Sequence, residues 1–396
     1  MHWKSQKDGD TWAHDPPEDG KMATSFTRIC IPFGSDDSLR DSYLSHTGAS
    51  PIRFGKLLED MDIFAVYLAY AHIQNGPLTG APCHPKIGVV TACVDRIDLQ
   101  PSVAQTLRDI SNVYDTVFEG HITWVGRSSL EASIRFLHND KGVNGLWVVL
   151  MEARVVLVAT DARTGKTVAV RGLKVETDEE TRLFECGQEN ADRRKTQRSI
   201  TLFKTPPDPS ETKLLHSLFT STLGKRTLSF EHIALPPGNV WMEDCKLSNS
   251  IICFPQESNM YGKMFGGFLM RQAVELGWAT ASVFARCRPS AMSVDDINFR
   301  KPVEIGSLLH LNAEVCYTEG PRMLVRVQAD VIEPDTGTWE TTNTFHFLFF
   351  HPQGNDVPKV MPRSYADGML YISGKRHHDH SVKQHSAYAK GTAPEL

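Results

Sequence analysis

The sequence lacks the cysteine pairs that mark redox centres and zinc sites. Its eight cysteines are scattered over 396 residues, and none of them forms a C-x-x-C pair. A secretory leader is not visible either. We therefore expect free thiols in a reducing compartment.

Neither sign of charge dominates the chain. Lysine plus arginine is 42 and aspartate plus glutamate is 47, which gives a net charge of −5. A nucleic-acid-binding face would need a basic excess, so a function on DNA or RNA is not expected. The G-x-S-x-G signature of serine hydrolases is also missing, which argues against a Ser–His–Asp triad.

Long apolar runs are missing too. The most apolar helix expected from the sequence has an uncharged stretch only from 276 to 285. That is well short of the roughly 20 apolar residues that cross a bilayer, so no membrane span is expected. The first 20 residues are rich in acids, unlike a transit peptide. We expect residues 1–24 to be a disordered tail.

The sequence does contain an internal repeat, in which one helix is followed by several strands. A helix with apolar residues at helical spacing is expected over 52–72. Strands rich in β-branched residues are expected to follow it at 86–99, 113–137, 147–160 and 166–175, with a hairpin turn at 161–165. A second helix over 258–286 follows a strand at 250–254. It is followed by strands at 291–299, 307–317, 322–332 and 338–351.

The two halves also share local sequence. Val94–Leu99 has its echo in Val294–Phe299, Trp124 matches Tyr317, and Trp147 matches Trp339. A repeat of this length indicates a duplicated domain. The fold class predicted is α+β, each half a long helix wrapped by an antiparallel sheet. The expected divisions are domains at 25–176 and 248–360, a partly structured linker at 177–247 with a helix near 211–223, and a polar tail at 361–396.

The turn and helix start of the second half read N-x-x-G-x-x-F-G-G from Asn259 to Gly267. With the segments 53–60, 125–129 and 265–273, this motif resembles the double hotdog acyl-CoA thioesterases, most of all the mitochondrial acyl-coenzyme A thioesterase 9 group. The likeness spans about residues 24–360.

The resemblance implies a tandem hotdog enzyme that hydrolyses acyl-CoA to a free fatty acid and coenzyme A. It implies no metal or redox cofactor, because coenzyme A is part of the substrate. It also implies trimers of double-hotdog chains and a place in the mitochondrial matrix, although the acidic N-terminus leaves a cytoplasmic form open.

Asp62 is the predicted general base. It lies in the apolar run Met61–Ala65, so burial should raise its pKa and make it a better base. Asp62 stands seven residues past Gly55, whereas the same count past Gly267 reaches Val274. The resemblance implies that such a carboxylate works with an asparagine of the partner hotdog. A surface position on the helix, with Asp60 as the acid, is the alternative.

Asn259, Gly266 and Gly267 complete the predicted site. The glycine N–H groups at a helix start are unpaired and suit a developing oxyanion. Close helix packing would require glycine as well. Asn259 would orient the attacking water or hold the thioester carbonyl, and its alternative is an ordinary turn asparagine.

Exchanging the roles of the two halves gives a second potential site, the mirror-image site, which is expected to be degenerate. His46-Thr47-Gly48 stands where the second half has Asn259, and Arg53-Phe54-Gly55 stands where it has Phe265-Gly266-Gly267. Glu275 is one place off the register of Asp62. We therefore predict one complete site and one incomplete site in each chain.

The resemblance implies that the segment 125–129 flanks coenzyme A, where Arg127 could meet a phosphate. Other basic side chains near strand ends are further candidates, with solvated strand ends as the alternative. The candidate contacts are Arg127, Ser128, Ser129, Arg300, Lys301 and Arg322. The run His377–His380 could hold a metal, but in a disordered tail it is more simply incidental. Two other functions stay open: a non-catalytic acyl-CoA or nucleotide-binding sensor, and a hotdog dehydratase, which would want a catalytic histidine.

Overall fold

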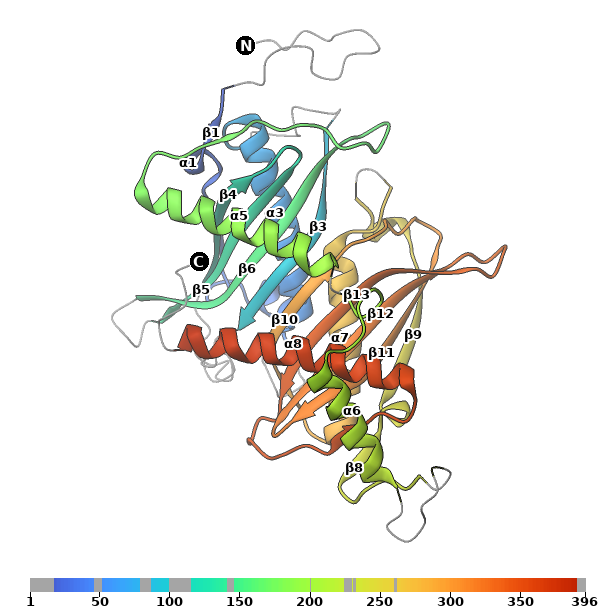
Figure 1. The fold of residues 1–396 in the computed structure, drawn as a ribbon. Helices are drawn as coiled ribbons and strands as arrows, with labels where there is room; N and C mark the ends of the chain where they lie inside the picture. Colours follow the sequence, from blue (N-terminus) through green and yellow to red (C-terminus); the bar gives the residue numbers. More distant parts are fainter. Residues whose placement is uncertain are drawn as a thin grey trace.

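One ten-stranded sheet forms the middle layer of the protein, in the strand order β2-β4-β5-β6-β3-β10-β13-β12-β11-β9 (Figure 1). The computed structural model describes residues 18–45, 52–78, 87–99, 115–140, 146–199, 201–223, 230, 233–259 and 262–389. The first five strands belong to the first half of the chain and the last five to the second half. The sheet therefore joins the two halves edge to edge.

Each half wraps its strands around one long helix. The first half has α3 (Phe54–Gln74) and the strands β2 (Thr27–Ile31), β3 (Ile87–Leu99), β4 (Thr116–Val125), β5 (Ser129–Asp140) and β6 (Leu146–Asp161). The second half has α7 (Gly266–Ala285) and the strands β9 (Lys246–Ile252), β10 (Ser290–Asn298), β11 (Leu308–Glu319), β12 (Arg322–Ile332) and β13 (Trp339–Phe350). The predicted tandem hotdog architecture is confirmed.

The seam between the halves is the antiparallel pair β3–β10. Val94 lies opposite Ile297, and Val294 lies opposite Ile97. Equivalent residues of the repeat thus exchange places across the seam, as a pseudo-twofold axis requires. The same four side chains are buried, at 0–1% exposure, so apolar burial fixes the register in which the halves join.

Bulges fall at matching places in the two halves. The β4–β5 ladder shifts register between Ile122 and Trp124, and the β11–β12 ladder does so between Val315 and Tyr317. Trp147 and Trp339 likewise occupy corresponding rungs, opposite Asn139 and Ile332. The sequence matches of Trp124 with Tyr317 and of Trp147 with Trp339 are therefore structural equivalences.

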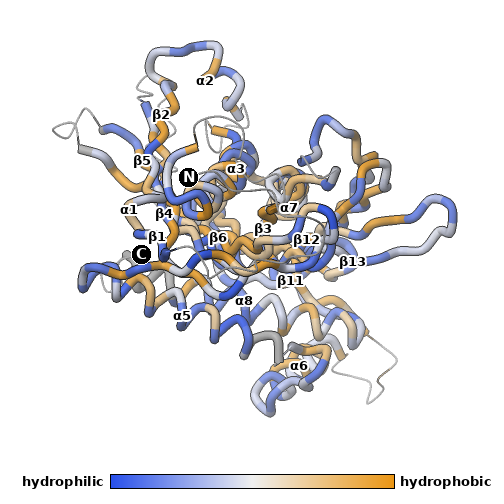
Figure 2. The backbone as a smooth tube through the Cα atoms, turned by 90° about the horizontal axis from the view of Figure 1, so that it is seen from above, coloured by the Kyte–Doolittle hydropathy of each residue, from blue (hydrophilic) through white to orange (hydrophobic). Residues whose placement is uncertain are grey.

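The molecule has three layers, which are clearest in the view from above (Figure 2). The apolar helices α3 and α7 lie together on the inner face of the sheet, and two more hydrophilic helices, α5 (Asp178–Ser199) and α8 (Tyr365–Ala389), lie on the outer face. A helix that packs on a sheet and on a second helix has few solvent positions, which explains why α3 and α7 are apolar almost all round.

The linker holds more structure than the sequence suggested. Its charged part forms α5, and α6 (Pro209–Thr222) begins with a capping box of Asp208 and Glu211. The α5 helix is anchored to the sheet because Arg194 pairs with two buried carboxylates, Asp95 on β3 and Glu131 on β5. Its polar surface therefore does not make it a free linker.

The predicted disordered C-terminal tail is wrong for residues 365–389, which form α8. This helix contacts β10, β11, β12 and β13. Ile372 is fully buried and His378 is 1% exposed, while His377 and His380 contact the buried carboxylate of Asp295 at 2.9 and 3.3 Å. The histidines that made the tail look polar are the groups that attach it.

Two smaller predictions also fail. Only Leu173–Lys174 of the expected strand 166–175 forms a strand, β7, because the segment crosses the β4–β5 turn instead of extending the sheet. Within the predicted N-terminal tail, Gly20–Lys21 pairs with β7 as β1, and Met22–Ser25 forms the short helix α1 with Met22 buried.

Candidate active site

The Asp62 carboxylate lies between the two halves, in the middle of the α3–α7 contact. Its side chain is 1% exposed. Oδ1 accepts a hydrogen bond from the Thr91 hydroxyl on β3 at 2.5 Å, and Oδ2 accepts one from the backbone N–H of Gly267 on α7 at 2.7 Å. Three elements from both halves therefore meet at this single side chain.

Helix α7 has no cap of its own. The residue before its first turn is Phe265, which makes no side-chain cap hydrogen bond. The first N–H groups of a helix need an acceptor and carry a partial positive charge. The Asp62 carboxylate supplies that acceptor from the other half of the chain, so it caps α7 in place of a local side chain.

Burial raises the pKa of the Asp62 carboxyl, and the hydrogen bonds from Thr91 and Gly267 act in the opposite direction. The net direction is upward. A carboxylate with a raised pKa accepts a proton more readily than one in water. The site thus holds a positioned base in surroundings that exclude bulk solvent.

Gly266 and Gly267 allow the close approach of the two helices. A Cβ on Gly267 would lie 2.8 Å from Glu59 Cα, and one on Gly266 would lie 3.2 Å from Asp62 Oδ2. The packing explanation of the double glycine therefore holds for Gly267. Its N–H already binds Asp62, which contradicts its predicted role as an oxyanion donor. The N–H of Gly266 has no acceptor among the described residues.

The mirror-image position lacks the same chemistry. Gly55 faces Val274, whose Cγ1 would lie 3.2 Å from a Cβ at Gly55, as Gly267 faces Asp62. The repeat places Ala291 where the first half has Thr91. Neither the carboxylate nor the hydroxyl is present there. His46, Thr47 and Gly48 lie outside the described residues.

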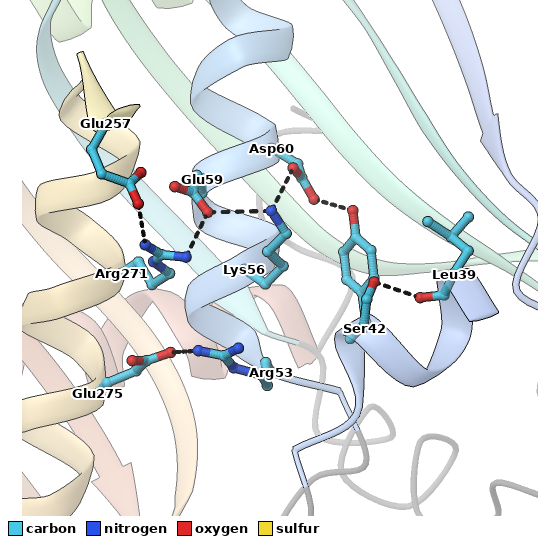
Figure 3. Close-up of polar contacts among 10 residues, drawn as sticks. Leu39, Ser42, Arg53, Lys56, Glu59, Asp60, Glu257, Arg271 and Glu275 are labelled. Carbon is cyan, nitrogen blue, oxygen red and sulfur yellow. Dashed lines mark hydrogen bonds and ion pairs between the residues drawn. The ribbon is translucent and has the colours of Figure 1, made fainter. Parts of the chain in front are cut away.

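The other acidic side chains of the helix pair are engaged in ion pairs (Figure 3). Glu275 pairs with Arg53 at 2.6 Å, and Arg271 bridges Glu59 and Glu257 at 3.3 and 3.5 Å. Asp60, the alternative base, accepts a hydrogen bond from the Tyr43 hydroxyl at 2.5 Å, on the side of α3 away from α7. The ion pairs of Arg53 and Arg271 fasten the two helices, whereas the Asp62 carboxylate is the acidic group that accepts a backbone N–H at the start of α7.

Asn259 lies in the turn that leads into α7. Its side-chain Oδ1 accepts a hydrogen bond from Lys263 N–H at 3.1 Å, and its backbone pairs with Lys263 and Gly262. The structural role considered for a turn asparagine is thus present. The turn brings Asn259 to the same end of α7 as Gly266 and Gly267.

Arg127, Ser128 and Ser129 form the β4–β5 turn. Ser129 pairs with Val158, and Val158 pairs with Val90, the neighbour of Thr91. The turn therefore lies two strands from Thr91 on the same row of the sheet. Arg127 is exposed, and its carbonyl accepts a hydrogen bond from Val170 N–H.

The other basic candidates divide between the two positions. Arg300 and Lys301 follow the end of β10, beside the complete site; Arg300 is exposed and Lys301 pairs with Glu340. Arg322 begins β12 in the row of Phe350 and Ser290. That row belongs to the mirror-image position, so Arg322 is separated from Asp62.

Thr91 is the site residue that the sequence analysis missed. The matched strands Val94–Leu99 and Val294–Phe299 contained the signal, because three residues before each of them Thr91 and Ala291 differ. A hydroxyl in one copy and a methyl in the other parallels the difference between Asp62 and Val274. A comparison of the two repeats for positions that differ in parallel with Asp62 and Val274 could have selected Thr91.

The described part of the chain contains neither a metal cluster nor a membrane-spanning helix. It holds no group of three or more His, Cys, Asp or Glu side chains arranged for a metal ion. No helix in it has the length and hydropathy needed to cross a membrane.

Comparison with known proteins gives one family. Residues 261–336 match the model of the thioesterase superfamily. The chain is 41% identical over 364 residues to mouse mitochondrial acyl-coenzyme A thioesterase 9, covering 91% of this chain and 78% of the relative. It is 33% identical over 368 residues to mitochondrial acyl-coenzyme A thioesterase 4 of Humulus lupulus, covering 90% and 65%. A solved acyl-CoA hydrolase from Staphylococcus aureus, 25% identical with a TM-score of 0.37, covers 39% of this chain and 95% of that one.

The packing at the two glycines predicts unequal effects of alanine. Gly267→Ala should lower the free energy of unfolding by about 1–3 kcal/mol, because the new Cβ meets the backbone of Glu59. Gly55→Ala is the matched comparison: its Cβ would lie 3.0 Å from Arg271 Cγ, 3.2 Å from Val274 Cγ1 and 3.3 Å from Arg271 Cα. These contacts are tight but longer than the 2.8 Å to Glu59 Cα. Alanine favours the helix by roughly 0.5–1 kcal/mol over glycine in both variants, so Gly55→Ala should lose less stability than Gly267→Ala. Urea unfolding measures both variants, and equal losses would contradict the difference.

Proposed function

The chain belongs to the acyl-coenzyme A thioesterase family, and we propose that it hydrolyses acyl-CoA to a free fatty acid and coenzyme A, with Asp62 as the general base. The observation that carries the assignment of the base is the buried carboxylate held by Thr91 and Gly267 at the start of α7. Among the acidic groups of the helix pair, it alone occupies a helix N-terminus at the contact between the halves.

The proposed reaction needs only water and protein groups. Asp62 takes a proton from a water molecule while the water oxygen attacks the thioester carbonyl carbon. The carbonyl oxygen becomes an oxyanion, and the tetrahedral intermediate then expels the sulfur of coenzyme A. The thiolate takes up the proton, so the products are a carboxylic acid and a thiol.

Gly266 and Asn259 would stabilise the oxyanion. The Gly266 N–H lies at the positive end of α7, and a fixed donor at a developing charge contributes about 3 kcal/mol in comparable sites. Asn259 would hold the thioester carbonyl or the water from the turn before α7. In this proposal the Gly267 N–H positions the base and the Gly266 N–H serves the substrate.

The coenzyme A moiety would extend toward the basic groups that flank this site. Arg127 with Ser128 and Ser129 lies on one side of Thr91, and Arg300 with Lys301 lies on the other, at the end of β10. Arginine suits phosphate because it can donate two parallel hydrogen bonds. Arg322, which lies by the mirror-image position, has no part in this proposal.

We also propose that the chain forms a homo-oligomer, a trimer of double-hotdog chains. Light scattering of the purified chain tests this assembly, and a monomer in solution would reject it.

We propose a mitochondrial location as well, because the relatives compared above carry that description in their names. Imaging of a tagged full-length chain tests the location, and exclusion from mitochondria would reject it.

Removal of the base should abolish turnover. Asp62→Asn keeps the shape of the side chain but not its ability to accept a proton, so release of free coenzyme A from a panel of acyl-CoAs should fall at least about 100-fold. Asn259→Ala should also lose most activity. Asp60→Asn and Glu275→Gln are the controls and should keep most of it.

A fully active Asp62→Asn enzyme would reject the assignment of the base. Tight binding of acyl-CoA by the wild-type chain without release of coenzyme A would favour the sensor instead. Formation of an enoyl-CoA would favour the dehydratase.

The pH dependence of the reaction should depend on Thr91. Because the base works as a carboxylate, activity should fall as the pH falls through the raised pKa of Asp62. The Thr91 hydrogen bond lowers that pKa, so Thr91→Val should raise it and move the acid limb of kcat/KM to higher pH. Thr280→Val, which removes a buried hydroxyl on α7 bound to Leu276, should leave the limb in place. An unmoved limb in Thr91→Val would show that Asp62 is not the titrating group.

A further inference from the structure

Phe299 occupies the seam directly beside the proposed base. It is the first residue after β10, and its N–H donates a hydrogen bond to Ala92 O on β3 at 3.0 Å. This bond ties the residue to both halves of the sheet. The side chain is half-buried, while the next residue, Arg300, is exposed. The chain therefore passes from core to solvent at this point.

The Phe299 ring and the Asp62 carboxylate approach one another at Gly266. A Cβ on Gly266 would lie 3.2 Å from Phe299 Cζ and 3.2 Å from Asp62 Oδ2. The ring edge and the carboxylate oxygen are thus at most twice that distance apart. Any group bound at the carboxylate has the phenyl ring as its apolar neighbour.

Behind Phe299 the core is filled by a row of aromatic rings on β13. Phe345 is fully buried and meets Phe299 edge to face, with ring centroids 6.4 Å apart. Phe347 and Phe349 continue the row at spacings of 6.1 and 6.3 Å. Gly277 on α7 lies over Phe347, where a Cβ would be 3.2 Å from the ring. The row runs from the carboxylate into the interior of the second half.

We propose that Phe299 sets the upper limit on the length of the acyl chain. This inference rests on the proposed function, which places the thioester carbonyl carbon beside Asp62. The coenzyme A end of the substrate extends toward solvent and the basic groups, so the acyl chain extends inward. Its first carbons meet the Phe299 ring, and the closely packed row behind the ring leaves no path for a longer chain. Short acyl chains are therefore the preferred substrates.

The repeat provides a matched comparison. Leu99 is the counterpart of Phe299 in the first half, at the end of the echoed strand. Leu99 lies toward the mirror-image position, where Val274 stands in place of Asp62 and Ala291 in place of Thr91. Truncation of Leu99 removes a similar apolar side chain at the equivalent place without opening the proposed active site.

The test is the chain-length profile of the full-length enzyme. Free coenzyme A release is measured with acetyl-, butyryl-, octanoyl- and palmitoyl-CoA for wild type, Phe299→Ala, Phe299→Leu and Leu99→Ala. The ratio of kcat/KM for octanoyl-CoA to that for butyryl-CoA should rise by about tenfold or more in Phe299→Ala, the scale of discrimination by a hydrophobic pocket. Palmitoyl-CoA should stay excluded, because the buried Phe345 ring still lies behind the space that the truncation opens. Phe299→Leu should shift the ratio less, and Leu99→Ala should keep the wild-type ratio.

A larger side chain tests the same idea in the opposite direction. Phe299→Trp should lower the octanoyl-to-butyryl ratio, so the proposal stays testable if Phe299→Ala does not fold. An unchanged ratio in folded Phe299→Ala or Phe299→Trp, or an equal shift in Leu99→Ala, would overturn the role of Phe299 while the hydrolysis proposal stands. Hydrolysis that survives Asp62→Asn would instead remove the assignment of the base, and with it the placement of the thioester beside Phe299. Absence of coenzyme A release by the wild type would remove the proposed function itself.

Discussion

The contact between Asp62 and the first turn of α7 is the interaction on which the rest of this site depends. A helix that starts with Phe265-Gly266-Gly267 has no side chain to cap it, and a buried carboxylate is costly unless donors surround it. The Gly267 N–H donates a hydrogen bond to Asp62 Oδ2 at 2.7 Å. This one bond gives the helix start an acceptor and gives the buried carboxylate a donor. Neither half of the chain could build this arrangement alone. The pairing of the two halves is therefore a requirement of the chemistry as well as of the fold.

Duplication followed by divergence explains why the described residues hold one such contact and not two. The pseudo-twofold axis passes through the β3–β10 seam, where Val94 faces Ile297 and Val294 faces Ile97. Packing is conserved at both helix starts, since Gly55 and Gly267 each receive the opposite helix closely. The polar groups are not duplicated: the second half has Val274 at the position of Asp62 and Ala291 at the position of Thr91. A second buried carboxylate would carry the same desolvation cost, whereas the Val274 side chain packs there at no such cost.

The outer layer shows how polar helices can belong to a folded core. Arg194 on α5 reaches Asp95, and the histidines of α8 reach the equivalent Asp295 in the other half. These two aspartates lie on neighbouring strands at the seam and face outward, so the helices cover the line where the halves join. Burial alone would raise the pKa of the Asp295 carboxyl, yet its contacts with His377 and His380 hold that pKa well below its usual range. Ionic contacts at sheet aspartates thus attach two segments that the sequence presents as linker and tail.

The sequence by itself determined the parts of this protein that depend on periodicity and repetition. Helical spacing located α3 and α7, alternation and β-branched residues located nearly all the long strands, and the count from each glycine singled out Asp62 over Val274. Only the tertiary structure decided what depends on contacts between distant segments. It gave the Gly267 N–H to Asp62 rather than to a substrate, added Thr91 to the carboxylate, placed Arg322 by the incomplete position, and folded residues 365–389 as a helix on the sheet. The physical reason is that local patterns encode which face of an element is apolar, whereas the partner of a polar group is chosen by which chain segments the packed core brings within hydrogen-bond distance.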